Sequence, residues 1–418
     1  MPCHERRRVA ARRRRRAGAW GLLALFLWAA PSAAATLDLV DTTYLRVRLS
    51  DRQGIRIRVR PPDLRFRIGG RLHLDASFFD EDRARFDDGF HVRRGRAYLW
   101  MSFGERWSAK VERELTSRRA GWRNVWLRYR PSSSVAVQAG NFIAPFSLAS
   151  VASSNDQVFA ERPLPTIIAP SYQTGLGIRT RGRTSLLADH GRWTWALAGY
   201  IESFGDAQND RHRSGHTGVA TRGTFAPVSG HRRLAQIGAS FDYESLDAKS
   251  RFRLSSRPEA GSGPSLLNTG RLSGVDRAIS VGVEGAGLLG PFWLEGEYLQ
   301  TWLARPDRPD PTFHGWYVQA GYLLTGESRR AVRSTAVLGS VRPRHRLGAL
   351  GVAARYSTVD LDDETVTGGH AHAFSVGLAW YLRENVRLVA DYVRVRAIDS
   401  RQRPDDPRIV QLRFVLFF

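Results

Sequence analysis

Apolar and polar residues alternate along the chain from residue 44 to the last residue, and the spacing typical of helices is hard to find. Neighbouring side chains of a β-strand point to opposite faces, so this alternation predicts strands with one apolar and one polar face. In the clearest segment, Phe66, Ile68, Leu72, Leu74, Ala76 and Phe78 alternate with Arg65, Arg67, Arg71, His73, Asp75 and Ser77. The pattern therefore predicts an all-β protein.

The same alternation recurs in ten further segments, and the connections between them differ in length. The segments are 107–115, 193–201, 235–243, 278–287, 292–303, 316–324, 347–356, 372–382, 386–395 and 409–418. The connections are short at 287–291 and 383–385, but long and polar at 205–218, 255–277 and 360–370. Short turns alternating with long loops favour an up-and-down barrel, because antiparallel strands place successive connections at opposite ends.

A soluble β-sandwich would also alternate, but the aromatic residues favour a membrane barrel. Trp, Tyr and Phe occur near the ends of strands whose other face carries Arg, Glu and Gln, as expected for aromatic girdles outside and a charged lumen inside. At roughly 20 to 24 residues per strand and connection, the chain holds about 15 to 18 strands, and bacterial barrels have an even number. We therefore expect a transmembrane antiparallel β-barrel of 16 strands with long extracellular loops.

Three regions are expected along the chain. Residues 1–35 have a basic start, a short apolar stretch and a small-residue cleavage pattern at Ala33–Ala35, which together predict a secretory signal peptide. The single cysteine, Cys3, lies in this segment. Residues 36–62 form a short N-terminal periplasmic hairpin or arm, in which strands 45–49 and 55–59 flank a turn and two prolines follow. Residues 63–418 form the barrel.

The basic residues are almost all arginine. The chain has 63 Lys and Arg against 40 Asp and Glu, and only Lys110 and Lys249 are lysines. The formal charge is +23, or +16 without residues 1–35, because that segment carries eight Arg and one Glu. Arginine suits bidentate phosphate or carboxylate recognition, although genome composition explains its use equally well. Carboxylates also lie on the polar strand faces, so we expect some arginines to be paired; these carboxylates are Asp75, Glu112, Glu114, Glu295 and Glu297.

Several short segments, in this order and spacing, resemble the phosphate-selective porins O and P. They are Phe66–Leu72, Val92–Arg94, Gly140–Phe146, Ser153–Ser154, Glu161–Arg162, Gly321–Glu327, Ala353–Ser357, Gly377–Tyr381 and the terminal Phe418. The resemblance covers residues 64–418. It implies a homotrimer of 16-stranded barrels, each with its own pore, in which inward-folded loops narrow the channel and arginines bind phosphate.

The resemblance also implies a set of constriction residues. By position they are Arg71, Arg94 and Arg162, with Arg93 adjacent, and the hydroxyl partners Ser153 and Ser154. Strand alternation agrees for Arg71 and Arg94, which share the polar face of their strands. Alternation places Arg93 on the opposite face, and we therefore expect it at a strand end or a subunit contact.

Residues 141–172 are the expected constriction loop. This segment contains four prolines and no strand pattern, and a loop of such length is usually functional or disordered. An ordinary surface loop is the alternative, because loops normally lie outside. The sequence departs from the phosphate-specific pattern at Ser150, where a lysine is expected, and at Asn124, where an acid is expected. General anion selectivity is therefore better supported than phosphate specificity.

These observations predict an outer-membrane porin of a Gram-negative bacterium, with a water-filled, anion-selective channel for passive uptake of phosphate or related small anions. The expected partners are these anions, outer-membrane lipid and lipopolysaccharide, two further copies of the chain, and the barrel-assembly machinery through Phe418. We expect no cofactor, no metal site and no nucleic acid.

His370 and His372 could bind a metal on a loop, but no third ligand is evident. A general anion porin and an outer-membrane enzyme or adhesin are the alternatives, although the sequence has no nucleophile elbow and no zinc-protease spacing.

Overall fold

The computed structural model describes residues 36–50, 54–80, 82–116, 120–184, 191–204, 215–247 and 250–418. The predicted signal peptide lies outside these residues. The compact unit discussed below comprises Thr36–Phe418.

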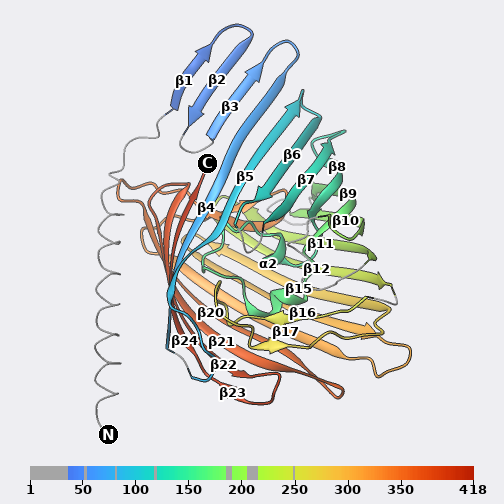
Figure 1. Cartoon of the computed structure of the whole chain (residues 1–418). Coiled ribbons are helices and arrows are strands. Elements are labelled where there is room, and N and C mark those ends of the chain that lie inside the picture. The colour runs from blue at the N-terminus through green and yellow to red at the C-terminus, as the bar shows by residue number, and fades with distance from the viewer. Residues whose placement is uncertain are drawn as a thin grey trace. The chain divides into compact units, whose positions relative to one another are not determined.

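Sixteen antiparallel strands form one closed sheet, which confirms the predicted all-β barrel (Figure 1). Each strand pairs with the next one along the chain, and the last strand pairs with the first from Arg408↔Asp80 to Phe417↔Arg71. The strands are β4 (Leu64–Asp80), β5 (Gly89–Phe103), β6 (Trp107–Glu114), β7 (Gly121–Tyr129), β8 (Val135–Ile143), β9 (Tyr172–Arg183), β10 (Arg192–Ile201), β11 (His216–Gly230), β12 (Arg233–Leu246), β15 (Arg277–Leu289), β16 (Phe292–Ala304), β17 (Thr312–Leu323), β20 (Ala349–Asp363), β21 (Val366–Tyr381), β22 (Val386–Ile398) and β24 (Arg408–Phe417).

A two-residue strand, β23 (Pro404–Asp405), pairs with the end of β22, and three N-terminal strands extend the sheet beyond the barrel. They are β1 (Thr36–Asp41), β2 (Leu45–Ser50) and β3 (Gly54–Val59), and β3 pairs with the first part of β4, Leu64–Ile68. The β2–β3 hairpin matches the one predicted over residues 45–59, and its turn residues 51–53 lie outside the described part of the chain. The closing strand β24 pairs only with the later part of β4, so the arm and β24 use different lengths of the same strand.

The barrel wall has an apolar outer face and a polar inner face. On β21, Phe374, Val376 and Leu378 are exposed, whereas the alternate residues Ser375 and Gly377 are buried against the interior. This distribution is what membrane immersion requires, because lipid contacts the outer face and water or packed polar loops occupy the inside. The described residues include one short α-helix, α2 (Leu148–Val151), and one short 3₁₀ helix, η1 (Leu164–Ile168), and neither is long and apolar enough to cross a membrane.

The connections differ from the sequence prediction in two places. Residues 360–370 are not a long loop: β20 continues to Asp363 and β21 begins at Val366, so only two residues join them. Their polar, Gly-containing sequence suggested a loop, but it forms the ends of two long strands. Conversely, the long connection between the predicted segments 316–324 and 347–356, residues 324–348 in the structure, lies at the end of the barrel where the pattern predicts short turns. It contains β18 (Arg329–Val332) and β19 (Val337–Val341).

The assignment of the outer face can be tested at Val376, which is exposed in the middle of the apolar part of β21. We expect Val376→Arg to lower the free energy of unfolding by about 2 to 4 kcal/mol, because the outer face would then carry a charge deep in the bilayer. Reversible denaturant unfolding of the protein in lipid measures this change, with Val376→Leu as the control. Equal stabilities of the two variants would contradict the assignment.

Candidate functional site

The connection between β8 and β9, residues 144–171, lies inside the barrel, as predicted for the constriction loop. Phe146, Leu164 and Ile168 are buried in one hydrophobic cluster with inward-facing residues of the wall, among them Leu299 and Phe313. Apolar burial therefore holds this segment, which we call the inner loop, against the strands opposite its point of entry.

Polar contacts fix the inner loop at its start and again past its middle. At its start, the Glu297 carboxylate of β16 accepts hydrogen bonds from the Ser147 hydroxyl at 3.0 Å and from the Leu148 backbone N–H at 2.8 Å. Further along, the Ala160 backbone N–H donates to Asp391 of β22 at 2.6 Å. Buried backbone donors need such acceptors, so these wall carboxylates serve the loop rather than the pore.

A second connection, residues 247–276, also enters the interior and contains β13 (Ser255–Ser256) and β14 (Leu267–Asn268). Its Glu259 is buried, forms an ion pair with Arg355 of β20, and accepts hydrogen bonds from Ser375 and from the Leu164 N–H of the inner loop. One carboxylate thus joins two loops and the wall. Sequence reasoning missed Glu259, because a single acid in a Pro- and Gly-rich loop gives no signal of its position.

Two arginines bind Glu161, one of the two acidic residues of the inner loop. Arg93 of β5 makes two hydrogen bonds to its carboxylate, at 2.6 and 2.7 Å, and Arg413 of β24 makes a third at 2.7 Å. Arg413 also binds Asp75 of β4 through two bonds of 2.6 Å. Burial alone would raise the pKa of Glu161, but the charges of Arg93 and Arg413 hold that pKa well below its ordinary value.

The position of Arg93 corrects the sequence prediction. Its side chain is buried and points inward to Glu161, although strict alternation placed it on the outer face. The reason is a register shift between β4 and β5: His73 pairs with Arg94, and the next residue, Leu74, pairs with Val92. Arg93 is therefore an extra residue of a β-bulge, which lets Arg93 and Arg94 both face the interior.

The other predicted constriction residues have different surroundings. Arg71 donates to the Ser154 hydroxyl at 2.9 Å and lies 3.7 Å from the Glu112 carboxylate. Arg94 is buried beside Arg93, with one guanidinium nitrogen 3.4 Å from Nδ1 of His73. The structure thus brings Arg71 and Ser154 into contact, and Arg94 contacts His73 instead.

Arg162 holds the shape of the inner loop. Its guanidinium donates to the backbone carbonyls of Ala149, Ser150 and Ala152, at 2.8, 3.3 and 2.8 Å. These carbonyls lie at and just after α2, where helix geometry leaves acceptors without partners. The Ser150 hydroxyl donates to the Pro170 carbonyl, and the Asn124 amide lies 3.4 Å from Glu112.

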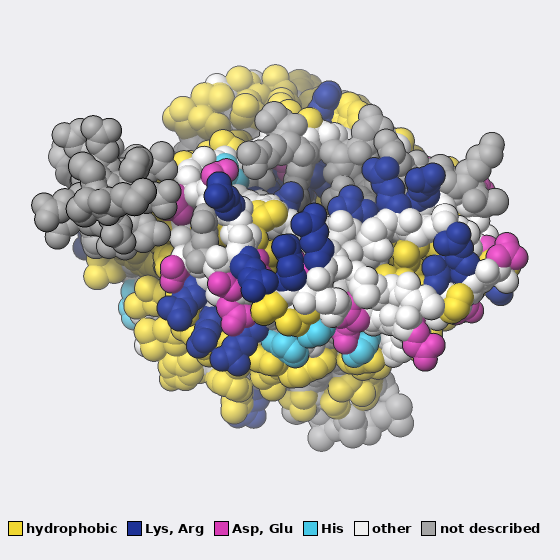
Figure 2. All heavy atoms as spheres, turned by 60° about the horizontal axis from the view of Figure 1, so that its bottom comes forward, with side chains coloured by type: hydrophobic (Ala, Val, Ile, Leu, Met, Phe, Trp, Pro, Cys, Tyr) yellow, Lys and Arg dark blue, Asp and Glu magenta, His cyan; other side chains and the backbone are white. Residues whose placement is uncertain are grey.

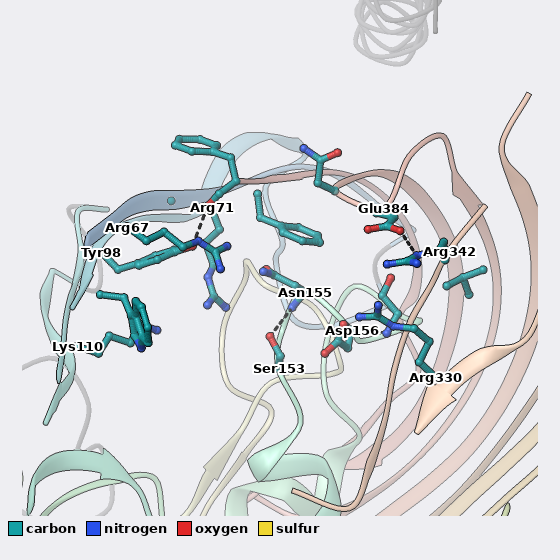
Figure 3. Close-up of a pocket in the computed structure, with 17 residues that line it drawn as sticks. Arg67, Arg71, Tyr98, Lys110, Ser153, Asn155, Asp156, Arg330, Arg342 and Glu384 are labelled. Atoms are coloured by element: carbon teal, nitrogen blue, oxygen red, sulfur yellow. Dashed lines mark hydrogen bonds and ion pairs between the residues drawn. The ribbon is translucent and has the colours of Figure 1, made fainter. Parts of the chain in front are cut away.

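A cavity of about 630 Å³ lies between the tip of the inner loop, strands β4 to β6 and the 324–348 connection (Figure 3). Its lining includes Ser153 and five basic residues, Arg67, Arg71, Lys110, Arg330 and Arg342. It also includes two carboxylates, both engaged: Asp156 accepts from the Ser340 N–H at 2.9 Å, and Glu384 pairs with Arg342. Within the described part of the chain, Arg67 and Arg330 have no carboxylate partner, so the cavity has an excess of positive charge.

A second basic cavity of about 110 Å³ lies along β7 to β10. Arg128, Arg130, Arg179 and Arg181 line it, and the described residues around it include no carboxylate. Sequence reasoning missed these arginines, although their positions on alternating strands could have identified them as inward-facing. The interior therefore carries basic surface on two sides.

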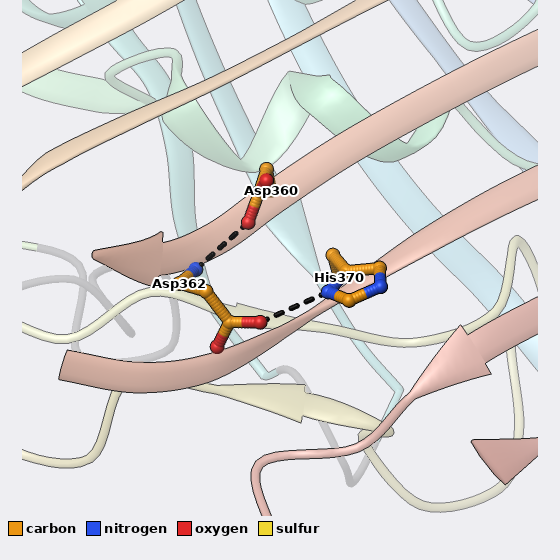
Figure 4. Close-up of side chains that lie close together, drawn as sticks. All are labelled: Asp360, Asp362 and His370. Atoms are coloured by element: carbon orange, nitrogen blue, oxygen red, sulfur yellow. Dashed lines mark hydrogen bonds and ion pairs between the residues drawn. The ribbon is translucent and has the colours of Figure 1, made fainter. Parts of the chain in front are cut away.

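A separate group of titratable side chains lies at the other end of the barrel (Figure 4). Asp360, Asp362 and His370 have ligand atoms within 4.8 Å of one another, and Nδ1 of His370 lies 2.9 Å from Asp362. His370 and His372 are on strand β21 and not on a loop, which corrects the sequence interpretation. Asp362 also accepts from the Gly369 N–H at 2.8 Å, so the group forms a local hydrogen-bond network at the strand ends.

Comparisons with known proteins agree with this architecture. Porin O of Pseudomonas aeruginosa is 27% identical over 90% of this chain and 93% of its own length. The anion-selective porin from Comamonas acidovorans has a similar fold, with a TM-score of 0.50 at 13% identity, covering 85% of this chain and 100% of that one. The trimer form of in-vitro folded OmpT from Vibrio cholerae gives a TM-score of 0.51 at 10% identity, covering 85% and 99%.

The family model of the phosphate-selective porins O and P matches residues 66–418, which include all sixteen barrel strands except the first two residues of β4. The chain therefore belongs to the phosphate-selective porin O and P family.

Proposed function

We propose that this outer-membrane protein forms a water-filled, anion-selective channel for the passive uptake of phosphate or related small anions. The observation that carries the proposal is the 630 Å³ cavity with five basic side chains in its lining. Arg342 pairs with Glu384, and Arg71 and Lys110 share Glu112. Among the described residues, Arg67 and Arg330 then have no carboxylate partner, so the cavity keeps an excess of positive charge. Membership of a porin family supports a channel rather than the alternative of an outer-membrane enzyme or adhesin. The anion selectivity of the structurally similar Comamonas porin supports the sign of the selectivity.

The proposed mechanism is electrostatic. Guanidinium groups set in a low-dielectric wall concentrate positive potential in the pore and raise the local concentration of anions. The paired arginines contribute little to this potential, because Glu161, Glu259 and Glu284 neutralise Arg93, Arg355 and Arg222. Selectivity therefore rests on basic side chains that no carboxylate fully neutralises. They are the unpaired ones around the two cavities, Arg94, which forms no ion pair among the described residues, and Arg71, which shares Glu112 with Arg96 and Lys110. Several shallow sites let an anion enter and also leave.

The assembly and the partners belong to the same proposal. We propose a homotrimer, supported by the trimer form in which the similar OmpT barrel was solved. The terminal Phe418 exchanges backbone hydrogen bonds with Gly70, at 3.0 and 3.1 Å, and its side chain is partly exposed at the short-turn end of the barrel. That exposure is compatible with recognition of Phe418 by the barrel-assembly machinery.

A general anion porin without a phosphate site is the second candidate function, and Ser150 and Asn124 favour it. Ser150 adds no charge to the inner loop, and the nearby Arg162 guanidinium is occupied by three backbone carbonyls. Asn124 lies beside Glu112 and brings no carboxylate of its own. Specific binding of phosphate would therefore rely on Arg71 and the hydroxyls of Ser153 and Ser154.

Anion selectivity can be tested at Arg71 and Arg94. We expect the wild-type channel to give an anion-selective reversal potential in a planar bilayer under a KCl gradient. Arg71→Gln and Arg94→Gln should each lower the chloride-to-potassium permeability ratio several-fold, because each removes a fixed positive charge from a low-dielectric site. Arg401→Gln, an equal loss of charge at an exposed position between β22 and β24, is the control. Ratios that match the control in both variants would remove these arginines from the constriction.

Phosphate specificity can be tested by gain of function at Ser150. We expect inorganic phosphate to inhibit the chloride current of Ser150→Lys at concentrations roughly tenfold lower than in the wild type, because a charge-assisted hydrogen bond to phosphate adds about 1.5 kcal/mol or more. Ser150→Met, which has a long but neutral side chain, is the control. Phosphate titration of single-channel chloride current measures the effect. Equal inhibition of the Lys and Met variants would contradict a phosphate site near residue 150.

A further inference from the structure

Four basic residues lie together on strands β21, β22 and β24, at the end of the barrel opposite the short turns. We call His372, Arg394, Arg396 and Arg408 the outer basic patch. The register places Arg394 directly opposite Arg408, and Arg396 directly opposite His372. The four side chains therefore form two neighbouring cross-strand pairs.

The patch faces away from the pore. Its residues have the same parity as Tyr392, Phe374 and Val410, which are 42%, 47% and 43% exposed on the outer wall. The residues of opposite parity on the same strands, Asp391 and Arg413, contact the inner loop. The patch is thus part of the membrane-facing surface and separate from the basic cavities described above.

Arg394 and Arg408 are like charges that lie directly opposite each other, an arrangement that costs stability, and Arg396 lies opposite His372, whose Nδ1 is 3.3 Å from the Tyr356 hydroxyl. Within the part of the chain that the structure describes, Arg394 and Arg396 contact no carboxylate. Asp80 approaches Arg408, but at 3.7 Å and with its side chain 72% exposed. The chain therefore supplies less negative charge than the patch requires, and an external anion would relieve the repulsion.

The position of the patch relative to the apolar outer wall indicates which kind of anion could reach it. Below it on each strand the outward-facing residues become apolar: Phe374, Val376 and Leu378 on β21, Tyr392 and Leu388 on β22, and Val410 and Leu412 on β24. The patch thus lies where the hydrocarbon region ends, toward the outside of the cell, because short turns mark the periplasmic end of such barrels. Figure 2 views this end obliquely and shows groups of basic side chains bordered by the hydrophobic outer wall.

We propose that the outer basic patch binds the phosphorylated headgroup of an outer-leaflet lipid, with the acyl chains lying along the apolar wall below. Arginine forks match phosphate oxygens, and basic residues at the membrane surface attract anionic lipids. One phosphate could accept hydrogen bonds from both Arg394 and Arg408 and remove their repulsion. The proposal rests on the outer-membrane location of the protein and goes beyond its transport function.

The test is lipid binding by the purified full chain in detergent micelles, with diphosphoryl lipid A as the probe and native mass spectrometry as the measurement. Each basic residue at an anionic lipid surface contributes about fivefold in affinity, so the double variant Arg394→Gln, Arg396→Gln should bind roughly thirtyfold more weakly than the wild type. The control is Arg308→Gln, Arg401→Gln, which loses the same charge from exposed connections at the same end and should bind like the wild type.

Two further comparisons test whether the lipid phosphate is what the patch recognises. The wild type should bind dephosphorylated lipid A as weakly as the double Gln variant binds the phosphorylated probe, and Arg394→Lys, Arg396→Lys should retain most of the affinity. Equal binding of phosphorylated and dephosphorylated lipid by the wild type would overturn the proposal. This comparison uses only the wild-type protein, so it does not depend on how the variants fold. Loss of the trimer in the Gln variant with unchanged lipid affinity would also overturn it, because the patch would then contact a second copy. Ion selectivity of the channel is measured separately and does not decide this test.

Discussion

Arg413 connects the three parts of the molecule that must fit together. It lies on the last strand and pairs across the closing seam with Asp75 of β4, and the same guanidinium binds Glu161 of the inner loop. Closure is obligatory, because an open sheet edge in a bilayer would leave backbone groups without hydrogen bonds. This one side chain therefore joins the closure of the barrel to the placement of the loop that narrows it.

Closure also determines where charge can be placed. Every strand has a face toward lipid and a face toward the interior, so most ionisable side chains must point inward or lie at the membrane surface. Inside, a charge is tolerated when a partner or water compensates for lost hydration. The carboxylates of Glu161 and Glu259 come from loops rather than strands. Glu259 neutralises Arg355, which strand alternation alone would assign to the pore, and Glu161 neutralises Arg93, which a bulge turns inward.

The sequence predicted the barrel because alternation is a local property that each strand carries for itself. The strand number is confirmed, and the predicted inward loop of residues 141–172 is found with the bounds 144–171, because its first three residues and its last residue belong to β8 and β9. The β2–β3 pairing matches the hairpin predicted over residues 45–59. Arg93 was placed on the wrong face because a bulge changes parity without changing composition. Residues 360–370 were taken for a loop because polar strand ends beyond the membrane resemble one. The ion pair of Glu259 with Arg355 could not be predicted from the sequence, because it joins residues far apart in the chain and depends on the path of a loop.

Arginine thus serves three purposes in this protein, and the partners of each arginine decide which. Arg93 and Arg355 are paired and hold loops, whereas Arg394 and Arg396 lie on the outer wall. Arg67 and Arg330 line a cavity, and neither has a carboxylate partner among the described residues. Strand alternation specifies only the face, so the role depends on the loops. Arg162 holds the inner loop through three hydrogen bonds to backbone carbonyls, and none of them involves the side chain at residue 150. A substitution at Ser150 can therefore change the charge of the constriction while the loop keeps its position.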